Sequence, residues 1–381
     1  MTTRTRRILA QLGSFALAGV LLYLALRGVD LDAVANALRE ADYRWIVPLG
    51  VITLLSHLLR AWRWQVLLEA LPPKTADAPP PSISLKVAFY SVMIGYMVNY
   101  AAPRMGEVAR TANLAAQHRL SFSGVFGTVV VERILDALVL LIGLVSAFFL
   151  LIEQSAVLQD LFINPIREQL GRIPALALVG LLAGLILLIL ILQRSFLRRE
   201  DSRLRQLWSR RVQPLWISFK DGLATVLRSP RRIALVGSTL GIWLCYLLMA
   251  YIPFQMFNFA GPYDLSLPDT WSIMMLGAVG VAIPSPGGIG SFHYITIQTL
   301  TVLFGVDHAG AASYAVFVHG GQMLLYIVVG FVCILLQGSS LGSLRKNTQA
   351  ASQEREEATA HDASDASPTT TQRHDRTPQG G

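Results

Sequence analysis

Runs of about 20 apolar residues recur along the chain, and they constrain its fold more than any other feature. A helix needs about 20 such residues to cross the ~30 Å hydrocarbon core of a bilayer. The sequence of 381 residues is 53% hydrophobic and only 15% charged, with a mean hydropathy of +0.49. Only helices and closed barrels satisfy their backbone groups in lipid. We therefore expect an all-α fold, a polytopic membrane helical bundle.

The net charge of +8 is unevenly placed. Basic residues gather at the N-terminus and between Arg194 and Arg232, where eleven Lys and Arg face three Asp and Glu. A positive charge of this size also suits nucleic-acid binding. Its concentration beside apolar runs instead indicates the positive-inside pattern. We predict a protein of the inner (cytoplasmic) membrane with both termini and the loop 194–232 in the cytoplasm, and no nucleic-acid partner.

The N-terminal apolar run has two interpretations. Basic residues precede it, and Ala16-Leu17-Ala18 offers a cleavage-like triplet, as in a signal peptide. The run continues to Leu26, which favours a retained helix. Cys245 and Cys333 lie inside later apolar runs, where we expect small core residues rather than a disulfide or a metal site.

Six segments have the length and composition of full crossings, and an even number returns the chain to its starting side. Residues 1–338 would form the membrane domain, and the polar tail 339–381 would be disordered. A short interfacial helix is expected at Leu31–Leu38 from its apolar spacing. The six segments are Ile8–Leu26, Trp45–Leu68, Phe122–Ile152, Ile173–Leu192, Ile233–Phe259 and Ser313–Leu336.

Two further apolar segments are interrupted by Pro and Gly. Ser84–Ala101 is followed by the polar Arg104–Arg119, and Thr270–Ile283 is separated from Ser291–Phe304 by Pro284–Gly290. We predict two re-entrant hairpins that enter the membrane from opposite sides. Opposed hairpins are typical of an inverted-topology repeat, which places broken helices around a substrate site.

The first break carries charges that hydrocarbon disfavours. Arg104, Glu107 and Arg110 recur every three residues and would share one helix face. The functional interpretation is a phosphate-binding polar pocket, because the Arg fork suits phosphate oxygens. The alternative is a self-neutralising ion network that pins helices together. We favour function, since charges at membrane depth are costly. The candidate residues here are Asn99, Arg104, Gly106, Glu107, Arg110, Glu132, Arg133 and Asp136.

The second break contains Pro284, Pro286, Gly287, Gly288 and Gly290. Proline removes N–H donors, and glycine permits positive φ and close backbone approach. A helix that resumes after the break would direct free N–H groups into it, which predicts an anion site.

Several other polar residues lie in apolar surroundings. His293 follows the second break and is expected to be a hydrogen-bonded polar residue, with a ligand or proton-relay role as the alternative. Arg60 and Arg63 lie near a helix end and are expected to snorkel to lipid phosphates. His57 and His319 are expected to be packing residues. No catalytic or metal-binding motif is present, so we expect neither an enzyme nor a cofactor.

Three motifs in this order resemble the lysylphosphatidylglycerol synthase transmembrane region, also called the flippase-like family. They are Pro-Arg104-x-Gly-Glu107-x-x-Arg110, Glu132-Arg133-x-x-Asp136 and Pro284-x-Pro-Gly-Gly-x-Gly290, and the resemblance covers roughly residues 8–338. It implies a membrane region that moves a phospholipid between leaflets, without the synthase activity of two-domain relatives. His293 stands where many relatives are expected to have Glu.

Together these features predict a membrane protein that binds or translocates an amphipathic phospholipid between leaflets. Membrane lipids would be its partners. One alternative is a membrane subunit for a separate lipid-modifying transferase, which would be a second partner. Another is a scaffold that transports nothing.

Overall fold

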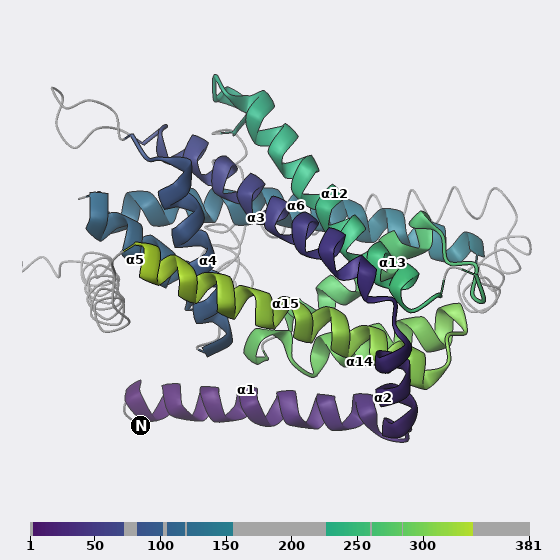
Figure 1. The fold of residues 1–381 in the computed structure, drawn as a ribbon. Helices are drawn as coiled ribbons and strands as arrows, with labels where there is room; N and C mark the ends of the chain where they lie inside the picture. The colour runs from purple at the N-terminus through teal and green to yellow at the C-terminus, as the bar shows by residue number, and fades with distance from the viewer. Residues whose placement is uncertain are drawn as a thin grey trace, which may run out of the picture.

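The computed structural model describes residues 3–71, 82–101, 105–118, 120–154, 226–259, 261–283 and 285–337. Within these ranges the chain is all helical and has no strand (Figure 1). Four helices are long and apolar enough to cross a membrane: Tyr43–Leu68, Phe122–Ile152, Arg232–Met256 and His308–Leu336. They coincide with four of the six predicted crossings. The predicted crossing Ile173–Leu192, the loop 194–225 and the tail lie outside the described residues.

The helices have the following bounds, in chain order: α1 (Thr3–Leu26), α2 (Leu31–Glu40), η1 (Tyr43–Trp45), α3 (Ile46–Leu68), α4 (Leu85–Ala101), α5 (Gly106–His118), α6 (Phe122–Gln154), α12 (Arg232–Met256), α13 (Leu267–Ala282), η4 (Pro286–Gly288), α14 (Ser291–Gln298), η5 (Thr299–Leu303) and α15 (His308–Leu336). Helix α1 contains the predicted crossing Ile8–Leu26, and the part of it whose side chains the structure describes without a gap, Phe15–Leu26, is apolar.

The two short helices of the first interrupted segment, α4 and α5, pack closely on each other. A Cβ on Gly106 would overlap the carbonyl oxygen of Gly95, so these helices can approach only through glycine. The side chain of Asn99 accepts the N–H of Gly106 at 2.7 Å and satisfies the first donor of α5.

The second interrupted segment has the same plan, with α13 packed on α14 and the turn η4 between them. Ser266 begins α13 with a capping box to Asp269. In the break, Gly287, Gly288 and Gly290 have φ of 58°, 80° and 82°. These positive values confirm that the turn requires glycine.

The chain repeats one order of elements: a long helix, two short helices, and a second long helix. This order describes both α3–α6 and α12–α15. The long helices α3 and α12 pack together, α4 packs on α15, and α13 packs on α6. Each half therefore inserts its first short helix against the last long helix of the other half.

The two breaks touch each other inside the bundle. Helix α4 contacts η4, and a Cβ built on Gly287 would lie 2.7 Å from the ring of Tyr100. Helix α1 lies along the edge of the bundle, and the elements that it packs against most are α14 and η4 of the second break (Figure 1).

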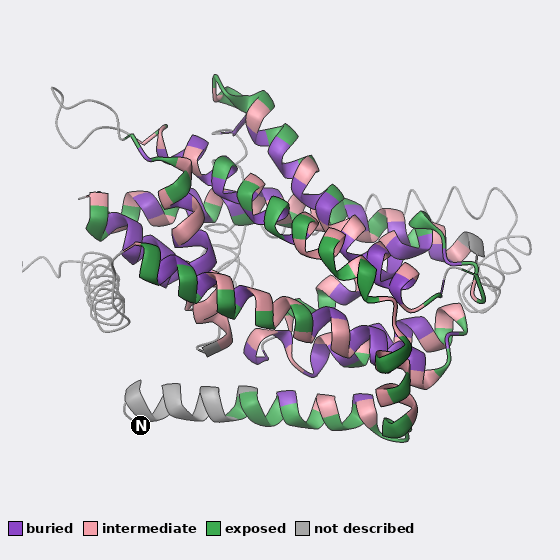
Figure 2. Cartoon of the chain, in the orientation of Figure 1, coloured by how far each residue is buried: buried purple, intermediate pink, exposed green. Residues whose placement is uncertain are grey.

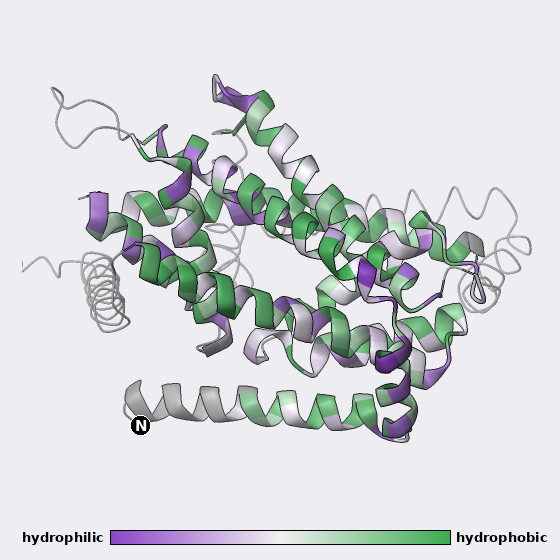
Figure 3. Cartoon of the chain, viewed as in Figure 1, coloured by the Kyte–Doolittle hydropathy of each residue, from purple (hydrophilic) through white to green (hydrophobic). Residues whose placement is uncertain are grey.

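The outward faces of the long helices are apolar. Figure 2 shows exposed residues along the outside of α15, and Figure 3 shows that the same helix is hydrophobic. Leu324, Val328 and Leu335 are examples, with 63%, 52% and 62% of their surface exposed. Contiguous exposed apolar surface of this kind suits contact with lipid tails.

Candidate functional site

An ion network joins α3, α5 and α6 in the core of the bundle. Asp136 accepts a hydrogen bond from Arg60 at 3.0 Å. It also forms ion pairs with Arg63 at 2.9 Å and with Arg133 at 3.4 Å. Glu132, one turn before it on α6, binds Arg110 at 2.6 Å and Arg63 at 3.5 Å. Two carboxylates are thus shared by four guanidinium groups. We call these six residues the arginine network.

The network has a buried layer. The side chains of Arg63 and Glu132 are completely buried, and Arg63 also donates to Thr239 on α12 at 3.0 Å. The guanidinium of Arg110 lies 4.7 Å from the ring centre of Trp64, within the range of a cation–π contact. These contacts fix the relative positions of four helices.

The prediction that Arg60 and Arg63 snorkel to lipid phosphates is wrong. Both are buried, and both direct their charge at Asp136 on α6. Arg60 also donates to the hydroxyl of Tyr246 at 2.6 Å. Buried carboxylates attract these side chains more strongly than the interface does, because a charge-assisted hydrogen bond strengthens in a low dielectric.

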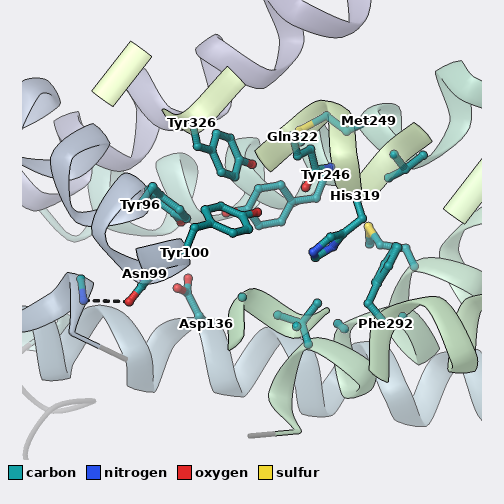
Figure 4. Close-up of a pocket in the computed structure, with 18 of the residues that line it drawn as sticks. Tyr96, Asn99, Tyr100, Asp136, Tyr246, Met249, Phe292, His319, Gln322 and Tyr326 are labelled. Atoms are coloured by element: carbon teal, nitrogen blue, oxygen red, sulfur yellow. Dashed lines mark hydrogen bonds between the residues drawn. The ribbon is translucent and has the colours of Figure 1, made fainter. Parts of the chain in front are cut away.

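A cavity of about 530 Å³ opens beside the network (Figure 4). One end is polar and is lined by charged residues from α3, α5 and α6 and by Asn99. In Figure 4 the carboxylate of Asp136 points into the cavity below Tyr100. The charged residues that line this end are Arg60, Glu107, Arg110, Arg133 and Asp136.

The middle of the cavity is walled by aromatic rings. The ring centre of Tyr326 lies 5.1 Å from that of Tyr96 and 6.3 Å from that of Tyr100 (Figure 4). Tyr246 connects this wall to the network through Arg60. Behind the wall, His57 packs edge-on against Tyr96 at 4.5 Å, which agrees with its predicted packing role.

The other end of the cavity, formed by α13, α14 and α15, is mostly apolar. Phe292 stacks on His319 with ring centres 5.1 Å apart, and both line the cavity (Figure 4). His319 was predicted to be a packing residue; it packs, and it also faces the cavity. Thr296 lies one turn after Phe292 on α14 and lines the same end. We call Phe292, Thr296 and His319 the α14 end.

Most of the predicted site residues meet at this cavity. Eight line it, Glu132 lies directly behind the lining in contact with Arg110, and Arg104 and Pro284 lie outside the described residues. Pro286, Gly290 and His293 are not among the described residues that line the cavity. The eight are Asn99, Gly106, Glu107, Arg110, Arg133, Asp136, Gly287 and Gly288.

Three N–H groups of the second break are occupied within the break itself, and the anion site expected at the start of α14 stays a prediction. The N–H groups of Gly288 and Ile289 bind carbonyls within the break, of Ser285 at 3.2 Å and Pro286 at 3.0 Å. The N–H of Gly290 donates to Nδ1 of His293 at 3.4 Å. His293 is therefore a hydrogen-bonded polar residue, as predicted. These three donors are occupied, and we place no anion on them.

The aromatic wall and the two arginines of α3 were not predicted as parts of the site from the sequence. Tyrosines in apolar helices are common, and no local pattern marks Tyr96, Tyr100, Tyr246 or Tyr326 as neighbours. One signal was available: Tyr96 and Tyr100 share a face with Asn99, one turn apart on α4.

The sequence matches the family model described as the lysylphosphatidylglycerol synthase TM region over residues 11–330. No curated protein and no solved structure matches the chain significantly. The match covers most of the chain and includes every helix that lines the cavity. The chain therefore belongs to the lysylphosphatidylglycerol synthase transmembrane-region family and is a multi-pass membrane protein.

Proposed function

We propose that this protein binds an amphipathic phospholipid in the cavity and moves it between the leaflets of the cytoplasmic membrane. The observation that carries the proposal is the cavity itself, which joins the arginine network to aromatic and apolar walls. Its volume of about 530 Å³ is in the range of small-molecule sites, roughly 300–1,000 Å³.

The arginine network supplies the chemistry for a phosphate. Four guanidinium groups share two carboxylates, so donors remain that the carboxylates do not use. Arg133 is the most accessible of them: its side chain is 44% exposed, and its contact with Asp136 is the longest of the three at 3.4 Å. A guanidinium fork binds phosphate through two parallel hydrogen bonds.

The helix arrangement supports a transport role. We interpret the pairs α4–α5 and α13–α14 as re-entrant hairpins, and the two halves as an inverted repeat. The exchanged packing of α4 on α15 and α13 on α6, and the contact between the two breaks, favour this interpretation. In transporters with such repeats, substrate sites lie near the midplane between broken helices.

The proposed topology predicts opposite sides for the two ends of α12. Arg228 and Arg231 precede this helix, Arg232 begins it, and these basic residues favour the cytoplasm. In a variant with both native cysteines replaced by alanine, Ser229→Cys should react with an impermeant thiol reagent only from the cytoplasm. Ser266→Cys, which precedes α13, should react only from the outside. Labelling of both from one side would contradict the inverted repeat.

Arg133→Gln tests the phosphate site with little expected damage to the fold, because Arg133 is partly exposed and Asp136 keeps Arg60 and Arg63. We expect at least a tenfold loss of affinity for phosphatidic acid in nanodiscs, about 1.4 kcal/mol. The free energy of unfolding should change by less than about 1 kcal/mol.

Arg44→Gln is the matched control, since Arg44 is 90% exposed and pairs only locally with Asp42 at 2.7 Å. It should bind the lipid like the wild type. Equal affinities for Arg133→Gln and wild type would show that the phosphate does not bind at the arginine network. The network would then have a structural role.

A further inference from the structure

We infer that the α14 end of the cavity is a second polar subsite, and that it takes the uncharged hydroxyl groups of a lipid headgroup. The hydroxyl of Thr296 and Nε2 of His319 would bind them. The inference rests on the proposed function, because it assumes that the phosphate lies at the arginine network. It adds the class of headgroup: a neutral polyol rather than an amine.

Thr296 behaves unlike comparable residues of this chain. A buried Ser or Thr in a helix usually donates to the carbonyl one turn back. The buried residues Thr270 and Ser313 do this at 2.8 and 2.7 Å, as does the partly buried Thr301 at 2.8 Å. The hydroxyl of Thr296 has no hydrogen-bond partner in the described structure, although only 1% of the residue is exposed. It lines the cavity instead.

His319 presents a second buried atom of the same kind. Only 6% of the residue is exposed, and Nε2 has no hydrogen-bond partner among the described residues. Its ring is held by Phe292 at 5.1 Å and by His293 at 5.0 Å, and Tyr100 lies across the cavity at 6.3 Å. Figure 4 shows the ring between Tyr100 and Phe292. The imidazole is therefore held in place facing the cavity.

The two unpaired atoms belong to residues that adjoin the same aromatic side chain, Phe292, at this end of the cavity. Phe292 stacks on His319, and Thr296 follows Phe292 by one helical turn. Both Phe292 and Thr296 approach Gly277, where an added Cβ would lie 3.2 and 3.3 Å from them. Leaving a buried polar group unpaired is costly, so native structures rarely do so without a reason. A hydroxyl group can both donate and accept, so the hydroxyl groups of a polyol could satisfy each of these atoms.

The surroundings exclude a charged group more than a neutral one. The described residues that adjoin this end of the cavity are uncharged. Examples are Gly277, Val281 and Gly288, together with the polar but neutral Gln322 on α15. An ammonium group here would lose its hydration without a carboxylate to replace it. The carboxylates that line the cavity, Glu107 and Asp136, belong to its other end.

The test measures binding of three lipids with identical acyl chains to the protein in nanodiscs: phosphatidylglycerol, phosphatidic acid and phosphatidylethanolamine. We expect the wild type to prefer phosphatidylglycerol. The double variant Thr296→Val with His319→Phe should lose at least tenfold affinity for phosphatidylglycerol and keep its affinity for phosphatidic acid. Thr301→Val is the control, because the Thr301 hydroxyl already binds a carbonyl, and it should change neither.

The outcomes separate this inference from the proposed function. Arg133→Gln could weaken the binding of all three lipids while the double variant leaves all three affinities unchanged. The phosphate site would then stand, and the subsite would be overturned as a headgroup site. Equal losses for phosphatidylglycerol and phosphatidic acid would also overturn the subsite, since the groups would then act on the shared part of the lipid. A wild-type preference for phosphatidylethanolamine would overturn the neutral headgroup. If the wild type binds none of the lipids, both proposals fall.

Discussion

Glu132→Gln should lower the free energy of unfolding by about 3–5 kcal/mol, the usual effect of removing one member of a buried ion pair. Glu132 is fully buried and holds Arg110 at 2.6 Å and Arg63 at 3.5 Å. In this variant Arg63 still pairs with Asp136 at 2.9 Å, so Arg110 is the guanidinium group that loses its carboxylate partner. Unfolding of the purified protein in mixed micelles by a denaturing detergent measures this change.

A double-mutant cycle then divides the network into its two roles. Removing both members of a buried pair can be nearly neutral for stability. We expect Glu132→Gln with Arg110→Gln to recover most of the lost stability and to bind phosphatidic acid weakly, because Arg110 lines the cavity. Full recovery of lipid binding would show that Arg110 only pins helices together. No recovery of stability would show that the two side chains are not coupled.

Gly290→Ala should release α1 from the bundle. Gly290 has a φ of 82°, and a Cβ there would collide with the backbone carbonyl of Ala18 and lie 2.9 Å from the N of Leu22. Both are backbone atoms of α1, so no side chain can rotate away. Among the described elements, helix α1 packs mainly against α14 and η4, so a collision at Gly290 disturbs its main attachment.

The release of α1 can be followed by thiol labelling. Ala18 is 5% exposed, so Ala18→Cys in a background without native cysteines should react slowly, and Gly290→Ala should accelerate the reaction at least tenfold. Gly305→Ala is the matched control: Gly305 also has a positive φ, 67°, but open space around it. It carries the backbone strain without the collision. Equal labelling in both variants would show that strain, not the collision, loosens α1.

The interrupted segments could be predicted from the sequence because their signals are local. Pro and Gly end helices wherever they occur, so Pro284–Gly290 marks a break without knowledge of its neighbours. The positive φ of Gly287, Gly288 and Gly290 follows from the same chemistry. What these glycines touch depends on distant segments, since Gly287 meets Tyr100 and Gly290 meets α1.

The partners of the charges could not be predicted in the same way. Arg60 and Arg63 lie near the end of an apolar helix, a pattern that also suits snorkelling. Their partner Asp136 is more than 70 residues further along the chain. The spacing of Glu132 and Asp136 correctly placed them on one face of α6, but it could not show which helix that face meets.

The two interpretations of the charged cluster describe different layers of one network. Arg63 and Glu132 are fully buried and bind only protein groups among the described contacts, as a structural pin would. Arg133 and Asp136 line the cavity and are partly exposed, as a binding site requires. A buried pin gives the exposed arginines a fixed position, and a fixed position lowers the cost of ordering them around a ligand.

Transfer of a fluorescent phospholipid between the leaflets of proteoliposomes tests the central claim most directly. Labelled phosphatidylglycerol in one leaflet is quenched by an impermeant reagent after set times, with and without an imposed proton gradient or membrane potential. The account predicts that the wild type and Arg44→Gln move the lipid faster than protein-free liposomes, and that Arg133→Gln does so at least tenfold more slowly than the wild type. Wild-type rates equal to those of protein-free liposomes under every condition, or equal rates for Arg133→Gln and wild type, would contradict it.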